Sequence, residues 1–146
     1  MQDLTRRGWM LAVVLGTARW RTAFAAEDRF VVIVHHDNPV KSVDRDFLRD
    51  AFLKKATDWS HGEAIRPVDL SSRFEVREVF TREVLRKTSA QLRSYWNQQI
   101  FSGKGTPPVE ADSIAEMLEY VASNPGAVGY LPAGASPARV KVVEVK

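Results

Sequence analysis

The hydrophobic positions of the chain form two alternating patterns from residue 28 onward. Short runs rich in β-branched and apolar residues predict strands at 28–36, 64–70, 125–131 and 139–145. Apolar residues spaced three and four apart predict amphipathic helices at 43–55, 71–84, 90–101 and 113–124. Strands that alternate with helices are typical of an α/β fold. We therefore expect one α/β domain of about 120 residues.

Polar residues and a glycine mark the ends of the predicted helices. Ser72 and Glu75 have the spacing of a capping box, in which each side chain binds a backbone N–H of the other residue. Ser89 and Asp112 precede the next two helices as N-caps, and Gly103 follows helix 90–101 as a C′ glycine. These end signals agree with the helices that the hydrophobic spacing predicts.

The apolar stripe of helix 90–101 includes the largest side chain of that segment. Trp96 lies on the same helical face as Leu92 and Ile100. A stripe of this kind faces the core of a small domain. We therefore expect Trp96 to have a structural role, in the core between helix and sheet, and not to stack on a ligand.

The start of helix 71–84, SSRFEVREVF, also has the composition of an anion-binding site. A helix N-terminus beside cationic and hydroxyl groups attracts anions, and a glycine-rich turn can bind them through backbone N–H groups. The candidate anion-binding residues are Ser71, Ser72, Arg73, Arg77, Lys104, Gly105 and Thr106. The alternatives are that both arginines pair with Asp69, Glu75 or Glu78 and that the turn at 103–106 only stops a helix. The sequence favours a capped helix over an anion site.

His35, His36 and Asp37 carry metal-ligand side chains at the end of the first predicted strand. Successive side chains of a strand point to opposite faces, so His35 and His36 are not expected to share an ion, and we expect no metal. The sequence also has no Gly-x-Ser-x-Gly elbow, no His-Glu-x-x-His helix and no glycine-rich dinucleotide turn. We therefore expect a protein that is not an enzyme and holds no cofactor.

Residues 1–25 form a different kind of segment. Arg6 and Arg7 precede an apolar stretch of about 11 residues, and Ala23 and Ala25 are the small residues of a cleavage signal. The stretch is shorter than the roughly 20 residues of a membrane span. It predicts a cleaved signal peptide, a periplasmic location and no stable membrane anchor. The arginine pair leaves the general and the twin-arginine export routes both open.

The charge of the remaining domain, 26–146, depends on this cleavage. The whole chain carries 21 Lys plus Arg and 18 Asp plus Glu, a formal net charge of +3. Without the four arginines and the one aspartate of the leader, 17 cationic and 17 anionic residues remain. A neutral domain without a basic run predicts no nucleic-acid partner. The sequence has no cysteine, which removes disulfides and thiol chemistry.

Several blocks of the domain together resemble a known family. They are DFLRDAFLKKATDWSHGEAIRPVDL, REVF, YWNQQIFSGKGTPP and NPGAVGYL, in this order, between about Val31 and Leu131. Their order and spacing are similar to those of short, single-lobe members of the phosphate ABC-transporter substrate-binding family, in the periplasmic-binding-protein type 2 superfamily. The resemblance implies a single α/β lobe, with a small mixed sheet flanked by about four helices, and an ancestry in binding phosphate or another small oxyanion.

The same resemblance implies that half of a ligand clamp is missing. Full-length relatives close two lobes on phosphate, whereas this chain has room for one. Where they carry Ser-Gly-Thr-Arg, this chain has Phe74-Glu75-Val76-Arg77, so only the arginine remains. Glu75 would repel a bound dianion at a cost of about 1–4 kcal/mol. We expect weak oxyanion binding or, as the alternative, a periplasmic interaction or sensory module that uses the cleft face against a protein partner or a second copy.

Overall fold

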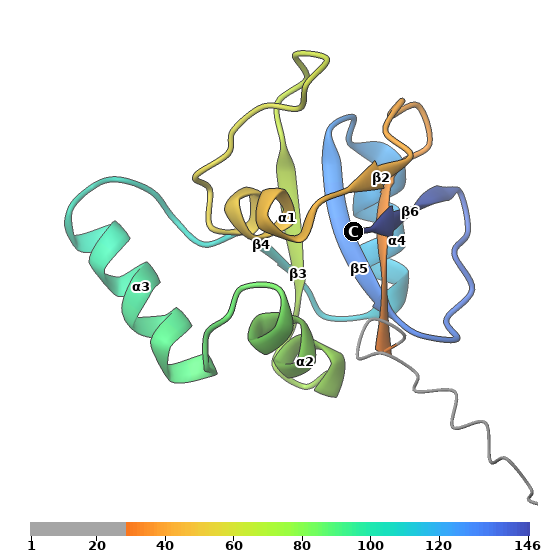
Figure 1. The fold of residues 1–146 in the computed structure, drawn as a ribbon. Helices are drawn as coiled ribbons and strands as arrows, with labels where there is room; N and C mark the ends of the chain where they lie inside the picture. Colours follow the sequence, from red (N-terminus) through yellow and green to blue (C-terminus); the bar gives the residue numbers. More distant parts are fainter. Residues whose placement is uncertain (1–28) are drawn as a thin grey trace, which may run out of the picture.

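The computed structural model describes residues 29–146, which form a six-stranded sheet with four helices (Figure 1). The strands are β1 (Phe30–His35), β2 (Ser42–Val43), β3 (Arg66–Leu70), β4 (Val109–Ala111), β5 (Ala127–Pro132) and β6 (Val140–Val145). The helices are α1 (Arg45–Phe52), α2 (Glu75–Glu83), α3 (Ser89–Phe101) and α4 (Ile114–Ser123). The predicted α/β fold is confirmed. The predicted signal peptide, with its cleavage signal at Ala23 and Ala25, lies outside the described residues.

The sheet is mixed, and its strands follow the order β2-β6-β1-β5-β3-β4. β1 pairs antiparallel with β5 and β6, whereas β3 pairs parallel with β4 and β5. The carboxyl ends of β3, β4 and β5 therefore lie at one end of the sheet. His35, the last residue of β1, lies at the opposite end because β1 runs in the other direction.

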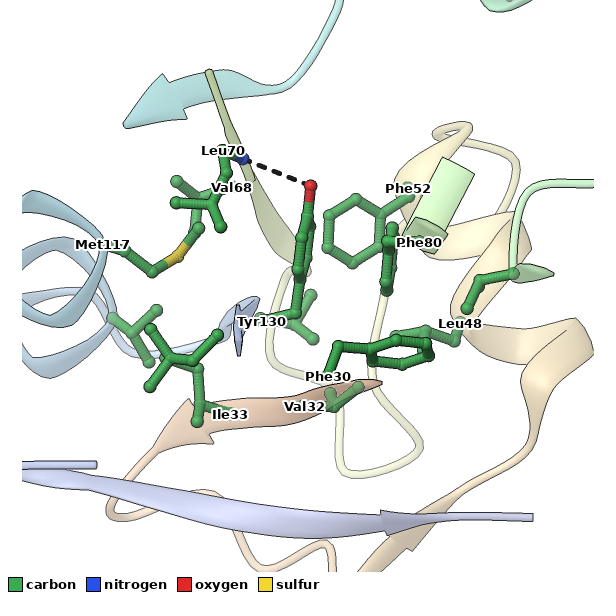
Figure 2. Packing of buried hydrophobic residues seen from close by; sticks show 14 of the residues in the cluster. Phe30, Val32, Ile33, Leu48, Phe52, Val68, Leu70, Phe80, Met117 and Tyr130 are labelled. Atoms are coloured by element: carbon green, nitrogen blue, oxygen red, sulfur yellow. Dashed lines mark hydrogen bonds between the residues drawn. The ribbon is translucent and has the colours of Figure 1, made fainter. Parts of the chain in front are cut away.

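Helices pack on both faces of the sheet. In Figure 1, α4 lies on one face, α1 and α2 lie on the other, and α3 projects from the body beside α2. Figure 2 shows Met117 of α4 on one side of the strands and Phe52 and Phe80 on the other. The ring of Tyr130 stacks on Phe80, with centroids 3.9 Å apart. None of the four helices in residues 29–146 combines the length and apolar composition that a membrane span requires.

Two short strands and two helix caps differ from the sequence predictions. β2 has two residues and β4 has three, which is too short for a periodic signal in the sequence. The N-caps of α3 and α4 are Thr88 and Ser113, not Ser89 and Asp112. Each of these two hydroxyls accepts the N–H of the residue three positions later, as an N-cap must.

The C-terminal end of α3 confirms one prediction and corrects another. Gly103 has φ +68° and follows the C-cap, as expected of a C′ glycine. Trp96 is 7% exposed, which confirms its place in the core. Ile100, expected on the same buried stripe, is 52% exposed because the last turn of α3 has left the body of the domain. The core therefore holds only the first two turns of α3.

Candidate functional site

Two helices begin at the carboxyl ends of β3 and β4. The chain passes from β3 through Ser71 towards α2, and from β4 through Asp112 towards α4. The N–H of Ser71 donates to the carbonyl of Ala111 at 2.9 Å, and the guanidinium of Arg73 donates to the carbonyl of Asp112. These bonds hold the starts of the two helices together. Ligands of open α/β sheets bind at the carboxyl ends of strands, so this end is the candidate site.

The start of α2 has no side-chain cap. Its N-cap residue is Phe74, and within residues 29–146 no acceptor binds the N–H of Glu75 or Val76. The predicted capping box of Ser72 and Glu75 is therefore wrong. The helix begins at Glu75, which places this carboxylate at the first helical position and not at the third. The first turn of α2 keeps free donors for water or a bound anion.

Arg77, the residue that remains from the expected phosphate cradle, is held by two carboxylates. Its Nε lies 3.5 Å from Oδ2 of Asp69, and its Nη1 lies 3.1 Å from Oε2 of Glu110. Pairing with Asp69 was one of the structural alternatives for this arginine, and Glu110 is a partner that the sequence did not indicate. Two negative neighbours reduce the attraction of Arg77 for a further anion.

Asp69 is buried at the end of β3 and contacts three groups. One carboxylate oxygen accepts the N–H of Leu70 at 2.9 Å and the hydroxyl of Tyr130, and the other faces Arg77. Figure 2 shows the Tyr130 hydroxyl directed at the end of β3, near the Leu70 nitrogen. Burial raises the pKa of Asp69, and attraction to Arg77 offsets only part of this rise. Burial and the Asp69 charge also raise the pKa of Tyr130.

A groove of about 650 Å³ opens between α2 and α3 and is here called the α2/α3 groove. Its charged lining residues are Arg73, Arg77, Arg93, Glu75, Glu78 and Glu110. Apolar side chains of Phe74, Leu92 and Trp96 line it as well. The three positive and three negative side chains balance, so the groove is amphipathic and formally neutral.

The predicted anion-binding residues near α2 lie at or behind this groove. Ser72, Arg73 and Arg77 line it. Ser71 is buried, and its hydroxyl accepts from the Nε of Arg73 at 3.4 Å. The guanidinium carbon of Arg73 also lies 5.9 Å from the ring centroid of Phe74. The structure thus brings these four residues together, although Arg73 already contacts protein groups on two sides.

Residues 104–106, the second part of the predicted anion site, lie elsewhere. They follow the end of α3 and do not line the α2/α3 groove. The N–H groups of Gly103 and Lys104 donate to the carbonyls of Ile100 and Gln99, which closes the helix end. In Figure 1 this end of α3 lies far from α2. Lys104, Gly105 and Thr106 therefore do not join the residues at the start of α2.

Arg93 is a groove residue that the sequence did not indicate. It follows Ser89 by four positions on the face of α3 that lines the groove. No hydrogen bond or ion pair joins it to another residue of the described chain. Its four-residue spacing to Asn97 could have shown that both residues lie on one face of α3. Whether this face is directed towards α2 depends on how α3 packs.

The histidine cluster has a geometry that differs from the expectation. The rings of His35 and His36 stack with centroids 4.1 Å apart, so these side chains do not point to opposite faces. β1 ends at His35, and the turn that follows ends the strand alternation. Potential ligand atoms of His35, His36 and Asp37 lie within 4.8 Å of one another. However, Nδ1 of His35 already accepts the N–H of Asp37 at 3.1 Å, so binding an ion there would break this bond.

Comparisons with known proteins identify the fold. No protein-family model and no curated protein matches the sequence. An ABC-type phosphate transport receptor from Vibrio cholerae aligns with a TM-score of 0.64 and 19% identity, over 80% of this chain and 46% of its own. A phosphate-bound structure from Clostridium perfringens, assigned to the phosphate ABC transporter substrate-binding proteins, aligns with a TM-score of 0.64 and 21% identity, over 80% and 44%. PstS from Borrelia burgdorferi aligns with a TM-score of 0.62 and 11% identity, over 80% of this chain and 47% of its own.

These similarities concern the fold, because the sequence identities are low. This chain spans less than half the length of each of the three solved structures. Residues 29–146 therefore have the α/β fold of a single lobe of the phosphate ABC-transporter substrate-binding proteins.

Proposed function

We propose that the protein is an exported, non-enzymatic solute-binding-like lobe that binds phosphate or another small oxyanion weakly at the start of α2. The observation that carries this proposal is the uncapped start of α2, with free N–H groups on Glu75 and Val76 beside the α2/α3 groove. Ser72 and Arg73 line the same groove and add a hydroxyl and a positive charge. The phosphate-transport proteins that share the fold support an oxyanion as the ligand class.

The carboxylates around the site oppose strong binding. Arg77 is paired with Asp69 and Glu110, so a bound anion would compete with both for its charge. Glu75 stands in the first turn of α2, where repulsion of a dianion costs about 1–4 kcal/mol, depending on the local dielectric. We therefore expect a dissociation constant of about 1 mM, which corresponds to roughly 4 kcal/mol of binding free energy.

The second candidate function is a periplasmic interaction or sensory module that has lost ligand binding. The observation that favours it is the pairing of Arg77 with two carboxylates, together with two exposed apolar residues, Ile100 and Phe101, at the end of α3. In this function the groove contacts a protein surface and not a small anion. Both candidates place the protein in the periplasm, on the basis of the leader at 1–25.

Calorimetric titration separates the two candidates. The purified protein is titrated with phosphate, sulfate and small carboxylates at low ionic strength, where charge interactions are least screened. Arg73→Gln removes a cation at the groove, and Arg66→Gln is the matched control because Arg66 is exposed at the start of β3, at the opposite end of the strand from α2, and does not line the groove. We expect phosphate binding that Arg73→Gln weakens several-fold and Arg66→Gln leaves unchanged.

Two results would contradict oxyanion binding at the start of α2. If none of the anions binds at concentrations of about 10 mM, oxyanion binding is wrong and the interaction module remains. Equal weakening by Arg73→Gln and Arg66→Gln would indicate a general effect of net charge and would place the anion away from the start of α2.

A further inference from the structure

We propose that Glu110 is the internal counter-anion of the site at the start of α2: its carboxylate occupies the position on Arg77 that a bound oxyanion takes, and it leaves Arg77 when an anion binds. This role rests on the proposed oxyanion binding and identifies the residue that limits its affinity. The sequence did not indicate Glu110, and the carboxylate that it placed against the anion was Glu75.

The guanidinium of Arg77 meets one carboxylate at Nε and another at Nη1. Nε lies 3.5 Å from Oδ2 of Asp69, and Nη1 donates to Oε2 of Glu110 at 3.1 Å. Nη2 has no hydrogen-bond acceptor among residues 29–146. A guanidinium binds a phosphate most strongly through two parallel N–H bonds. Because Asp69 faces Nε, the edge formed by Nη1 and Nη2 can donate both bonds only after Glu110 has released Nη1.

Of the two carboxylates on Arg77, Glu110 is the one that can move. The side chain of Asp69 is 9% exposed and also accepts the Leu70 N–H and the Tyr130 hydroxyl. The side chain of Glu110 is 47% exposed, and its bond to Arg77 is its one hydrogen bond within the described chain. Glu110 lines the α2/α3 groove, whereas Asp69 does not. An anion that arrives from the groove therefore displaces Glu110 and leaves Asp69 to hold Nε of Arg77.

The pairing of β3 with β4 explains why an anion replaces Glu110 and does not join it. Asp69 and Glu110 are direct partners in the parallel register, so their side chains leave the same face of the sheet. Like charges directly opposite one another on two strands are destabilising. Burial and the charge of Glu110 both raise the pKa of Asp69. Arg77 thus already compensates two neighbouring negative charges, and a bound anion would add further repulsion unless one of them leaves.

Removal of the Glu110 charge should therefore strengthen anion binding. Glu110→Gln keeps the length of the side chain and should bind phosphate at least about fivefold more tightly than the wild type, because no ion pair has to be broken and a repelling charge is gone. Glu144→Gln is the matched control for net charge, because Glu144 is exposed on β6, which β1, β5 and β3 separate from β4. Calorimetric titration with inorganic phosphate at low ionic strength measures the three dissociation constants.

The outcomes distinguish the role of Glu110 from the proposed function. Tighter phosphate binding by Glu110→Gln, with no change in Glu144→Gln, supports this role. Equal affinities of the wild type and Glu110→Gln, or an equal gain in both variants, would overturn it and leave weak oxyanion binding in place. Binding by Glu110→Gln alone would support the role and contradict phosphate binding by the wild type. No binding by any of the three proteins at about 10 mM phosphate would overturn both.

A second pair of variants tests whether Arg77 carries the effect. Arg77→Lys keeps a positive charge near Asp69 but cannot donate two parallel bonds from one planar group. In this background Glu110→Gln should improve phosphate affinity by less than about twofold, and loss of binding from both proteins would equally assign the gain to Arg77. A gain as large as in the presence of Arg77 would mean that Glu110 acts through general repulsion, which would overturn the exchange. Circular dichroism checks that each variant is folded.

Discussion

The hydroxyl of Tyr130 donates a hydrogen bond to the carboxylate of Asp69 inside the domain. The two residues are 61 positions apart and lie on the neighbouring parallel strands β5 and β3. The same carboxylate faces Arg77 at the start of α2. A buried polar contact therefore connects the centre of the sheet to the lining of the α2/α3 groove. Removal of this contact should affect both the stability of the domain and Arg77 in the groove.

Tyr130→Phe tests this contact. The substitution leaves the ring stacked on Phe80 but removes the hydroxyl donor, so Asp69 keeps a buried oxygen with one fewer bond. We expect the free energy of unfolding in urea to fall by about 1–3 kcal/mol. Tyr120→Phe is the control, because the Tyr120 hydroxyl has no partner in the described part of the chain. A loss of equal size in both variants would mean that the hydroxyl bond to Asp69 contributes nothing specific.

The pH dependence of stability should show the raised pKa of Asp69. Burial raises this pKa above 3.8, so protonation of Asp69 favours the folded state. Its contribution to the free energy of unfolding is fully present below pH 3.8 and is lost as pH rises through the folded-state pKa. Asp69→Asn keeps a carbonyl acceptor for Tyr130 and removes the titration. The stability of this variant relative to the wild type should therefore rise with pH above 3.8, in urea unfolding measured at several pH values.

The pKa of Glu119, on the surface, is shifted in the opposite direction, so its effect on the pH dependence of stability has the opposite sign. Hydrogen bonds from Arg139 and Ser123 lower the pKa of this carboxyl, so its contribution is present above pH 4.5 and is lost as pH falls through the folded-state pKa. Glu119→Gln should then remove a part of the acid sensitivity of the wild type. If both variants changed the pH profile in the same direction, the assignment of at least one pKa shift would be wrong.

Glu75→Thr tests the charge at the start of α2. Glu75 has no partner among the described residues, so its removal takes away no capping bond, and loss of its attraction to the helix dipole should lower stability by only about 0.3–1 kcal/mol. Threonine adds a hydroxyl and deletes the repulsion, which should improve phosphate affinity by about 1 kcal/mol or more. Calorimetry at low ionic strength measures this change. Glu144→Thr on β6 controls for net charge, and equal gains in both variants would contradict a local effect.

The fifth prediction concerns export. The arginine pair, the short apolar stretch and the Ala23 and Ala25 signal predict a mature N-terminus at Ala26 or Glu27. Mass spectrometry of the protein recovered from the periplasm checks this position, and an uncleaved N-terminus there would contradict it. Replacement of Arg6 and Arg7 by lysine should block export by the twin-arginine route. Normal export of that variant would leave the general route.

Local patterns in the sequence were sufficient for the elements with clear periods. Apolar residues at three- and four-residue spacing predicted α1 to α4, and the β-branched runs predicted β1, β3, β5 and β6. Trp96 was placed in the core from its spacing to Leu92 and Ile100, although Ile100 itself is exposed. The cap at Ser72 was misplaced because several hydroxyl and acidic residues precede α2, and only the backbone path selects the first helical residue.

The candidate site depended on contacts that no local pattern contains. Asp69 and Arg77 occur eight positions apart, but Tyr130 and Glu110 reach them only through the order of β3, β4 and β5 in the sheet. The stacking of His35 on His36 likewise required the exact point at which β1 ends.

The sequence by itself determined the α/β class, the amphipathic helices and the charges that are available at the start of α2, because these follow from composition and spacing along the chain. Only the tertiary structure decided which charges meet. It paired Arg77 with Glu110, directed Arg93 into the α2/α3 groove and separated residues 104–106 from Ser72. The physical reason is that charge pairing acts over a few ångströms in space, and chain folding sets those distances independently of separation in sequence.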